Sequence, residues 1–345
     1  IHRADVELHL SKSLKELKNG VILVGDSGNG RTSLLCQWTL YQQKNGNGIY
    51  FYDCGGSISS DIDLEIARDL GLISSEKVTN LLNEIGKIAS NRNKHFIIIF
   101  DALNEFRGQQ QENVETLIRK IDGLLGRLET DHVQIVLSCS SATWENLTRM
   151  RTLRLFWKRY YHPEANAQPL ITLTNYSLDE LAQAYQRYAE VFNLDIPFTK
   201  LSQELQTQLR DPLLMRMFAE AHQGMSNNFP YRNLGLSIFQ RYIEYRVQTK
   251  QEQYVLDKIA AEIVNQRRNY IRISDLMSDE KLSAWILDTE LSKPYHRLLD
   301  KGVITESSSD IPGENIVKFT YSRVAGYIVS SYLLRNSKFS ASETI

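Results

Sequence analysis

Residues 25–32 (GDSGNGRT) constrain the fold more than any other stretch of this sequence. They follow a compact apolar run, residues 21–24 (VILV), and precede a segment of helical pattern at residues 32–41. They match the pattern G-x-x-x-x-G-K-[ST] at every fixed position except the lysine, where Arg31 stands. In such a strand–loop–helix, glycines allow close approach to a phosphate, and backbone amides at the helix start surround it. The sequence therefore predicts a phosphate-binding loop.

The side chains of this loop suggest how it binds a nucleotide phosphate and its magnesium ion. We expect Thr32 to reach a magnesium ion on the phosphates. Arg31 keeps the positive charge of the usual lysine, but its planar fork is broader than an ammonium and fits less readily between terminal phosphates. Nucleotide binding with weak hydrolysis at most is therefore the expectation. The expected phosphate contacts are Gly25, Asp26, Ser27, Gly28, Asn29, Gly30, Arg31, Thr32 and Ser33.

Two carboxylates follow the most hydrophobic stretch of the chain, residues 95–100 (HFIIIF). Asp101 comes at the carboxyl end of this expected buried strand, beside the phosphate loop of a parallel sheet, where it can hold magnesium directly or through water. Glu105 is placed to orient or deprotonate an attacking water. The alternative is that both carboxylates merely lie in solvent at a strand end.

Hydrophobic patterning divides the 345 residues into three parts. In residues 1–175, short β-branched runs alternate with helical segments, which predicts an α/β fold with a parallel sheet and helices on both faces. Residues 176–250 are helical almost throughout, an all-helical lid. Residues 251–345 end in two short strands and a helix, which predicts a winged-helix domain. The expected strands are residues 21–24, 48–52, 95–100, 133–137 and 170–173, and the expected lid helices are residues 177–192, 199–209, 212–222 and 238–250.

Composition narrows the function classes. The net charge of −1 gives no general argument for a nucleic-acid or membrane partner. Residues 151–161 (RTLRLFWKRYY) interleave basic and aromatic side chains, which suits single-stranded nucleic acid or, as we favour, a partly buried connection. With no long apolar run and a charged start, the chain is expected to be cytoplasmic. The scattered cysteines Cys36, Cys54 and Cys139 predict neither disulfides nor a zinc site.

Taken together, these motifs resemble the STAND class of P-loop ATPases, and within it NACHT-like and bacterial antiviral (Avs-type) members. The resemblance covers nearly the whole chain. Beside the phosphate loop, it depends on residues 101–105 (DALNE), 138–144 (SCSSATW), 209–218 (LRDPLLMRMF) and 319–327 (FTYSRVAGY).

The resemblance implies ATP or ADP with Mg²⁺ as cofactors. It implies that Pro212 lies against the adenine and that the winged helix locks an ADP-bound resting state. Relatives commonly have arginine where Ser140 stands, so Ser140 is the expected, weaker contact at the terminal phosphate. Some relatives point a histidine at ADP where this chain has Tyr321, and Gly326 takes a place that is often acidic.

The leading hypothesis is an ATP/ADP-dependent switch that associates with other copies of itself on activation. Its sensor and effector domains are expected outside this segment, and the start at Ile1 suggests a boundary within a longer polypeptide. One alternative is a non-catalytic P-loop scaffold for protein–protein contact. Another is a DNA-loading ATPase related to origin-recognition AAA+ proteins, against which the neutral charge weighs.

Overall fold

The computed structural model divides the chain into two compact units, Ile1–Asn175 and Tyr176–Ile345, and each is described by itself. Residues 151–156, which hold much of the basic and aromatic stretch, lie outside the described residues. The structure describes residues 2–55, 58, 61–72, 74, 77–106, 113–149, 157–164, 168–224, 234–308 and 314–336.

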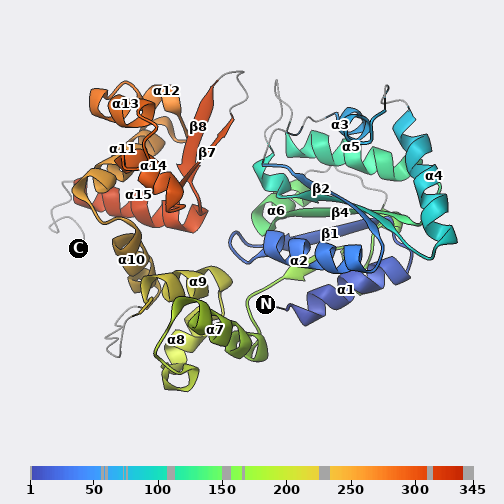
Figure 1. The fold of residues 1–345 in the computed structure, drawn as a ribbon, viewed down its shortest axis with the longest axis horizontal. Helices are drawn as coiled ribbons and strands as arrows, with labels where there is room; N and C mark the ends of the chain where they lie inside the picture. Colours follow the sequence, from blue (N-terminus) through green and yellow to red (C-terminus); the bar gives the residue numbers. More distant parts are fainter. Residues whose placement is uncertain are drawn as a thin grey trace. The chain divides into compact units, whose positions relative to one another are not determined.

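The first unit is built on a five-stranded parallel sheet with the order β2-β3-β4-β1-β5 (Figure 1). The predicted α/β fold with a parallel sheet is therefore confirmed. β1 and most of β3 and β4 are buried along their length, because helices cover both faces of the sheet and such strands can be apolar throughout. The strands are β1 (Gly20–Gly25), β2 (Gly48–Asp53), β3 (Phe96–Asp101), β4 (Val133–Ser140) and β5 (Ile171–Leu173).

The helices of this unit form a layer on each face of the sheet (Figure 1). On one face α1 and α2 bury Leu10 and Leu35 against alternate strand residues such as Ile97 and Ile99. On the other face α3, α4, α5 and α6 pack against the intervening residues, among them Ile98. The helices are α1 (Ala4–Lys15), α2 (Arg31–Lys44), α3 (Ile62–Asp69), α4 (Val78–Asn91), α5 (Val114–Arg127) and α6 (Ser141–Arg149).

The strand order sets the position of the loops that matter. From β1 the chain crosses by α2 to the outer strand β2, and it returns through β3 and β4 by helices on the opposite face. In open α/β sheets, a ligand crevice lies at the carboxyl ends of the strands where the winding direction reverses. The register pairs Gly25 with Ser140 and Asp53 with Asp101. The ends of β1, β2, β3 and β4 therefore meet at one edge.

The second unit joins helices to a small antiparallel sheet with the order β6-β8-β7. Helices that precede a β-hairpin agree with the winged helix expected from sequence. The third strand, β6 (Ile271–Arg272), is too short to show any periodicity. The other strands are β7 (Ile304–Ser308) and β8 (Asn315–Phe319). The helices are α7 (Leu178–Phe192), α8 (Gln203–Leu209), α9 (Pro212–Ala221), α10 (Leu234–Arg246), α11 (Lys250–Gln266), α12 (Ile273–Leu276), α13 (Glu280–Leu287), α14 (Pro294–Asp300) and α15 (Ser322–Asn336).

The expected helix at residues 238–250 ends earlier than predicted. α10 stops at Arg246, and α11 begins at Lys250. The boundary is a capping box, in which the Thr249 hydroxyl accepts the Glu252 amide and the Glu252 carboxylate accepts the Thr249 amide. Among the described residues, no helix combines the length and apolar character needed to cross a membrane.

Two histidines stack at the amino edge of the first unit's sheet, just before β3 and β4. The rings of His95 and His132 lie 5.0 Å apart and are nearly parallel. Burial, and secondly the charge of His132, lower the pKa of His95 to about 4. The unfolded chain therefore takes up the proton first as the pH falls. His95 adds stability above its ordinary pKa, and this contribution is lost between about pH 6.5 and 4.

We expect wild-type stability to fall by about 2 kcal/mol more than that of His95→Phe between pH 7.5 and 5. Phenylalanine keeps a flat ring beside His132 but cannot take up a proton. Urea unfolding at the two pH values measures the difference, and His2→Gln, at an exposed histidine, is the control. Equal pH dependence in wild type and His95→Phe would rule out this role for His95.

Candidate functional site

The phosphate loop spans residues 26–30, between the end of β1 and the start of α2. Gly28 and Gly30 have φ values of 89° and 85°, in the left-handed region that glycine enters at little cost. Gly30 is the N-cap of α2, which has no side-chain cap and no acidic residue in its first turn. The first amides of α2 and the positive end of its dipole are thus left for an anion.

The loop is tied to the last strand of the sheet at its base. A Cβ on Gly25 would lie 2.8 Å from the Leu173 carbonyl oxygen, so no other residue fits there without a shift. The buried Asn29 donates from Nδ2 to the same carbonyl at 3.2 Å. Asn29 was predicted as a phosphate contact, and the structure shows that its side chain anchors the loop to β5. That the backbone amide of Asn29 contacts a phosphate stays a prediction.

Asp101 joins the loop to the centre of the sheet. At the end of β3 it is 2% exposed. One carboxylate oxygen accepts a hydrogen bond from the Thr32 hydroxyl at 2.6 Å, and the other accepts from the Ser138 hydroxyl. The structure therefore brings Thr32 and Asp101 together, 69 residues apart in sequence.

A hydroxyl and a carboxylate are hard oxygen ligands of the kind Mg²⁺ takes, with phosphate oxygens and water completing its shell. The described residues contain no group of three or more His, Cys, Asp or Glu able to hold a metal ion by themselves. Thr32 and Asp101 fit a magnesium ion whose remaining ligands are phosphate oxygens and water.

Arg31 is the first residue of α2, and its side chain runs along the base of the loop. A Cβ on Gly25 would lie 3.5 Å from the Arg31 Cδ, so the arginine stem passes close to this glycine. Partial burial lowers the pKa of the Arg31 guanidinium, and the carboxylates of Asp101, Glu105 and Asp26 oppose this effect. Arg31 thus remains a cation at the carboxyl edge of the sheet.

Glu105 lies on the 3₁₀ turn η2 (Leu103–Glu105) and is exposed. A Cβ on Gly55 would lie 3.2 Å from Glu105 Oε2 and from Asp53 Oδ1, so this glycine brings the chain after β2 close to both carboxylates. Asp53 is a residue of this edge that was given no role from the sequence. It could have been recognised because it directly follows an expected strand, which places it at the same edge of the sheet as Asp101.

Ser140 ends β4 beside Gly25, as expected from the position of the strand. Its hydroxyl donates to Thr143 Oγ1 at 2.8 Å and accepts the Thr143 amide at 3.1 Å, so it caps the start of α6. A phosphate would compete with these bonds, and contact with the terminal phosphate stays a prediction.

Besides Asp53, two further polar residues of the site, Ser138 and Asn104, were given no role from the sequence. Ser138 binds Asp101 and also accepts the Ala102 amide at 3.1 Å. Asn104 accepts hydrogen bonds from Arg31 and from the Ser140 amide. Ser138 could have been found from strand alternation, because it lies two residues before Ser140 and shares its face of β4. Asn104 lies in a 3₁₀ turn after β3, where strand alternation gives no indication of where its side chain points.

Pro212 belongs to the second unit, where it is the buried first residue of α9. Asp211 caps this helix by accepting the amides of Leu213 and Leu214 at 3.0 and 3.1 Å. Proline suits this position because the first turn of a helix does not use its missing N–H. Contact between Pro212 and adenine stays a prediction.

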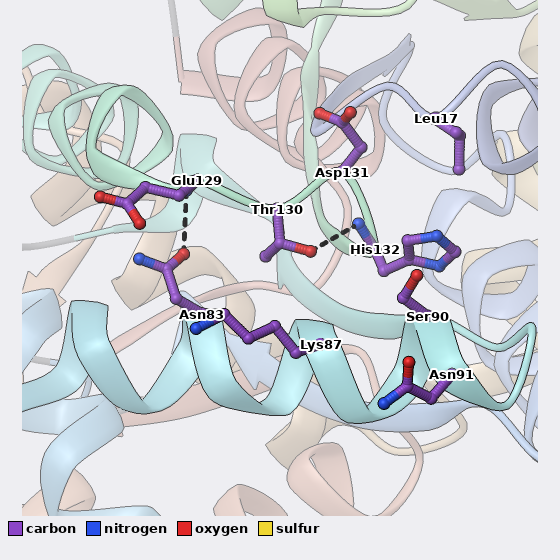
Figure 2. Close-up of a pocket in the computed structure, with 9 residues that line it drawn as sticks. All are labelled: Leu17, Asn83, Lys87, Ser90, Asn91, Glu129, Thr130, Asp131 and His132. Carbon is purple, nitrogen blue, oxygen red and sulfur yellow. Dashed lines mark hydrogen bonds between the residues drawn. The ribbon is translucent and has the colours of Figure 1, made fainter.

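A separate polar pocket of about 440 Å³ lies at the opposite edge of the sheet (Figure 2). Its lining includes Asn83 and Lys87 of α4 and residues 129–132, which lead into the amino end of β4. The side-chain oxygen of Asn83, Oδ1, accepts a hydrogen bond from the Glu129 amide at 2.9 Å, so this side chain braces the loop before β4 (Figure 2). The pocket shares no lining residue with the phosphate loop.

Comparisons with known proteins give structural likeness alone. No protein-family model matches the chain, and no curated protein matches it. A Walker-type ATPase of Pyrococcus abyssi is 15% identical with a TM-score of 0.44, over 95% of this chain and 95% of that one. Cdc6p of Pyrobaculum aerophilum is 13% identical with a TM-score of 0.40, over 97% and 94%.

A STAND protein of Pyrococcus horikoshii with a tetratricopeptide-repeat sensor is 15% identical, with a TM-score of 0.43. The likeness covers 95% of this chain and 42% of that longer one. Values this low carry no argument about function. The P-loop architecture of the first unit is instead supported by its loop sequence, its strand order and the contact between Thr32 and Asp101.

Proposed function

We propose that this chain is a nucleotide-dependent switch module that binds ATP or ADP with Mg²⁺. The observation that carries the proposal is the hydrogen bond between the Thr32 hydroxyl and the buried Asp101 carboxylate. It lies directly beside an uncapped helix start that follows a glycine-rich loop. Phosphate recognition and magnesium recognition thus meet at one edge of the sheet.

Each residue of the site has a role in this proposal. The amides of residues 28–33 would hold the phosphates, and Thr32 and Asp101 would hold Mg²⁺, which when bound neutralises charge on the terminal phosphates. Glu105 is exposed at the same edge and is the proposed base for an attacking water. We expect slow turnover at most, because Arg31 replaces the compact lysine and the Ser140 hydroxyl caps α6.

We further propose that the module works in a STAND protein of the NACHT-like, antiviral type. The sequence motifs at residues 209–218 and 319–327 support this assignment. Adenine is the proposed base, because the sequence contains no N-K-x-D motif for guanine. Pro212 is the proposed adenine contact. Self-association on activation, a cytoplasmic location, and sensor and effector domains outside this segment are parts of the same proposal.

Isothermal titration with ATP and with ADP, each with and without Mg²⁺, tests the binding function. We expect saturable heat with both nucleotides and tighter ATP binding with Mg²⁺. Thr32→Ala should weaken the magnesium-dependent part, whereas Thr39→Ala, on the same helix with its hydroxyl bonded to Cys36 O, should not. If millimolar nucleotide produces neither heat nor a thermal shift, the switch is wrong and a non-catalytic scaffold becomes the better explanation.

We expect Arg31→Lys to raise the ATP hydrolysis rate roughly tenfold or more, because a compact ammonium can stabilise charge on the phosphoryl group during transfer. A phosphate-release assay measures the rate. Arg119→Lys, at a surface ion pair on α5, is the control and should leave the rate unchanged. An unchanged rate in Arg31→Lys would show that more than the lysine is missing from the catalytic machinery.

A further inference from the structure

Asn104 connects three segments at the carboxyl edge of the first unit's sheet. Its Oδ1 accepts from Arg31 Nη1 at 3.3 Å and from the Ser140 amide at 3.1 Å. Arg31 begins α2, Asn104 follows β3, and Ser140 ends β4. Both neighbours of this oxygen are donors, which determines the orientation of the side-chain amide.

The backbone turn before Asn104 places this residue between Arg31 and Ser140. Ala102 has a φ of 57°, in the left-handed region that residues with a Cβ rarely adopt. The Ala102 amide donates to the Ser138 hydroxyl, which holds this turn in place. The chain therefore reverses directly after Asp101 and places Asn104 between Arg31 and Ser140.

The chemistry of an amide at this position differs from that of a carboxylate. A carboxylate beside Arg31 would form an ion pair and cancel much of its charge. The neutral oxygen of Asn104 orients the guanidinium without adding a further negative charge to those of Asp101, Glu105 and Asp26, which already act on Arg31. A phosphate oxygen is a stronger acceptor for arginine than an amide oxygen. Asn104 takes one N–H of the guanidinium, so a terminal phosphate can accept from the others while Arg31 stays on Asn104.

We propose that Asn104 is a positioning residue that presents Arg31 to the terminal phosphate and so sets the preference for a nucleoside triphosphate over a diphosphate. This inference rests on the proposed function, since it concerns the same site. When the terminal phosphate is absent, Arg31 stays on Asn104. When it is present, the other N–H groups of Arg31 donate to it, while Asn104 keeps its bonds to Arg31 and to the Ser140 amide. Asn104 thus links the state of the nucleotide to the end of β4.

The test measures the dissociation constants of ATP and ADP with Mg²⁺ for Asn104→Ala and Asn104→Asp. We expect Asn104→Ala to weaken ATP binding roughly tenfold, because Arg31 is then no longer held in position for the terminal phosphate, with ADP binding almost unchanged. Asn104→Asp should weaken ATP binding further, because its carboxylate pairs with Arg31 and repels the terminal phosphate. Asn83→Ala, which removes the bracing amide at the opposite edge, should leave the ATP/ADP ratio unchanged.

A double-mutant cycle separates positioning from simple support of the fold. If Asn104 acts through Arg31, then Asn104→Ala costs no further ATP affinity when Arg31→Ala is already present. Equal weakening of ATP and ADP, or the same loss in both backgrounds, would overturn the inference while leaving the proposed function intact. Absence of nucleotide binding by the wild-type chain would overturn both.

Discussion

Asp101→Asn is expected to weaken Mg²⁺-dependent ATP binding by roughly 10–100-fold, the usual cost of losing a group that orients metal ligands. The substitution keeps the shape of the buried side chain. Its Oδ1 can still accept from Ser138, and its NH₂ can donate to the Thr32 hydroxyl in place of the present reversed bond. The fold should therefore survive, while the negative charge that attracts Mg²⁺ is lost. Titration of ATP at several Mg²⁺ concentrations measures the effect.

A matched control is available in the same unit. Asp122 is also buried, and it accepts the Tyr160 hydroxyl at 3.0 Å. Asp122→Asn makes the same change far from the loop in sequence, and it should cost some stability without altering the Mg²⁺ dependence of ATP binding. If both variants change the Mg²⁺ dependence equally, or if neither does, Asp101 is not part of a magnesium site.

Glu252→Ala is expected to destabilise the second unit by about 3–5 kcal/mol. Glu252 is fully buried, and its Oε1 contacts Lys301 Nζ at 2.8 Å and Arg297 Nε at 3.2 Å. Burial alone would raise the pKa of Glu252, but hydrogen bonds from Lys301 and from the amides of Gln248 and Thr249 hold it below its ordinary value. Alanine would leave two cations without their shared carboxylate and would remove the half of the α11 capping box in which this carboxylate accepts the Thr249 amide.

The cost of the lost charge can be separated from the cost of the lost cap. Glu180 fills the same capping-box position at the start of α7, where its carboxylate accepts the Ser177 amide. Glu180→Ala is expected to cost about 1 kcal/mol. Urea unfolding, with hydrogen exchange of α11 as the local measure, compares the two variants. Similar losses in both would show that the buried ion pairs add nothing.

The interactions around Lys301 also connect the two parts into which the second unit was divided from the sequence. Lys301 Nζ donates to the Arg246 carbonyl, and Arg246 Nη1 donates to the Lys301 carbonyl, each at 2.8 Å. These bonds join the end of α10 to the residue after α14. Residues 176–250 and 251–345 lie in one compact unit, and their separation into lid and winged helix remains a prediction.

Patterns read over a few neighbouring residues were sufficient to predict most of the first unit. Strand β3 can be recognised in the sequence as a continuous apolar run, because helices cover both faces of the sheet there. The glycine-rich loop predicts its own conformation, because Gly28 and Gly30 occupy backbone angles that few other residues adopt readily. By contrast, α1 was visible only as a charged amphipathic segment, and β6 has two residues and no pattern.

Local sequence patterns were enough to predict the parallel α/β architecture, the place of the phosphate loop and the candidate roles of Thr32 and Asp101. These depend on local patterns and on the rule that carboxyl ends of parallel strands meet at one edge. Only the folded chain shows that Ser138 holds Asp101, that Asn29 ties the loop to β5 and that Asn104 bridges Arg31 to Ser140. Each of these bonds joins residues 36 or more positions apart, so the folded backbone chooses the partner.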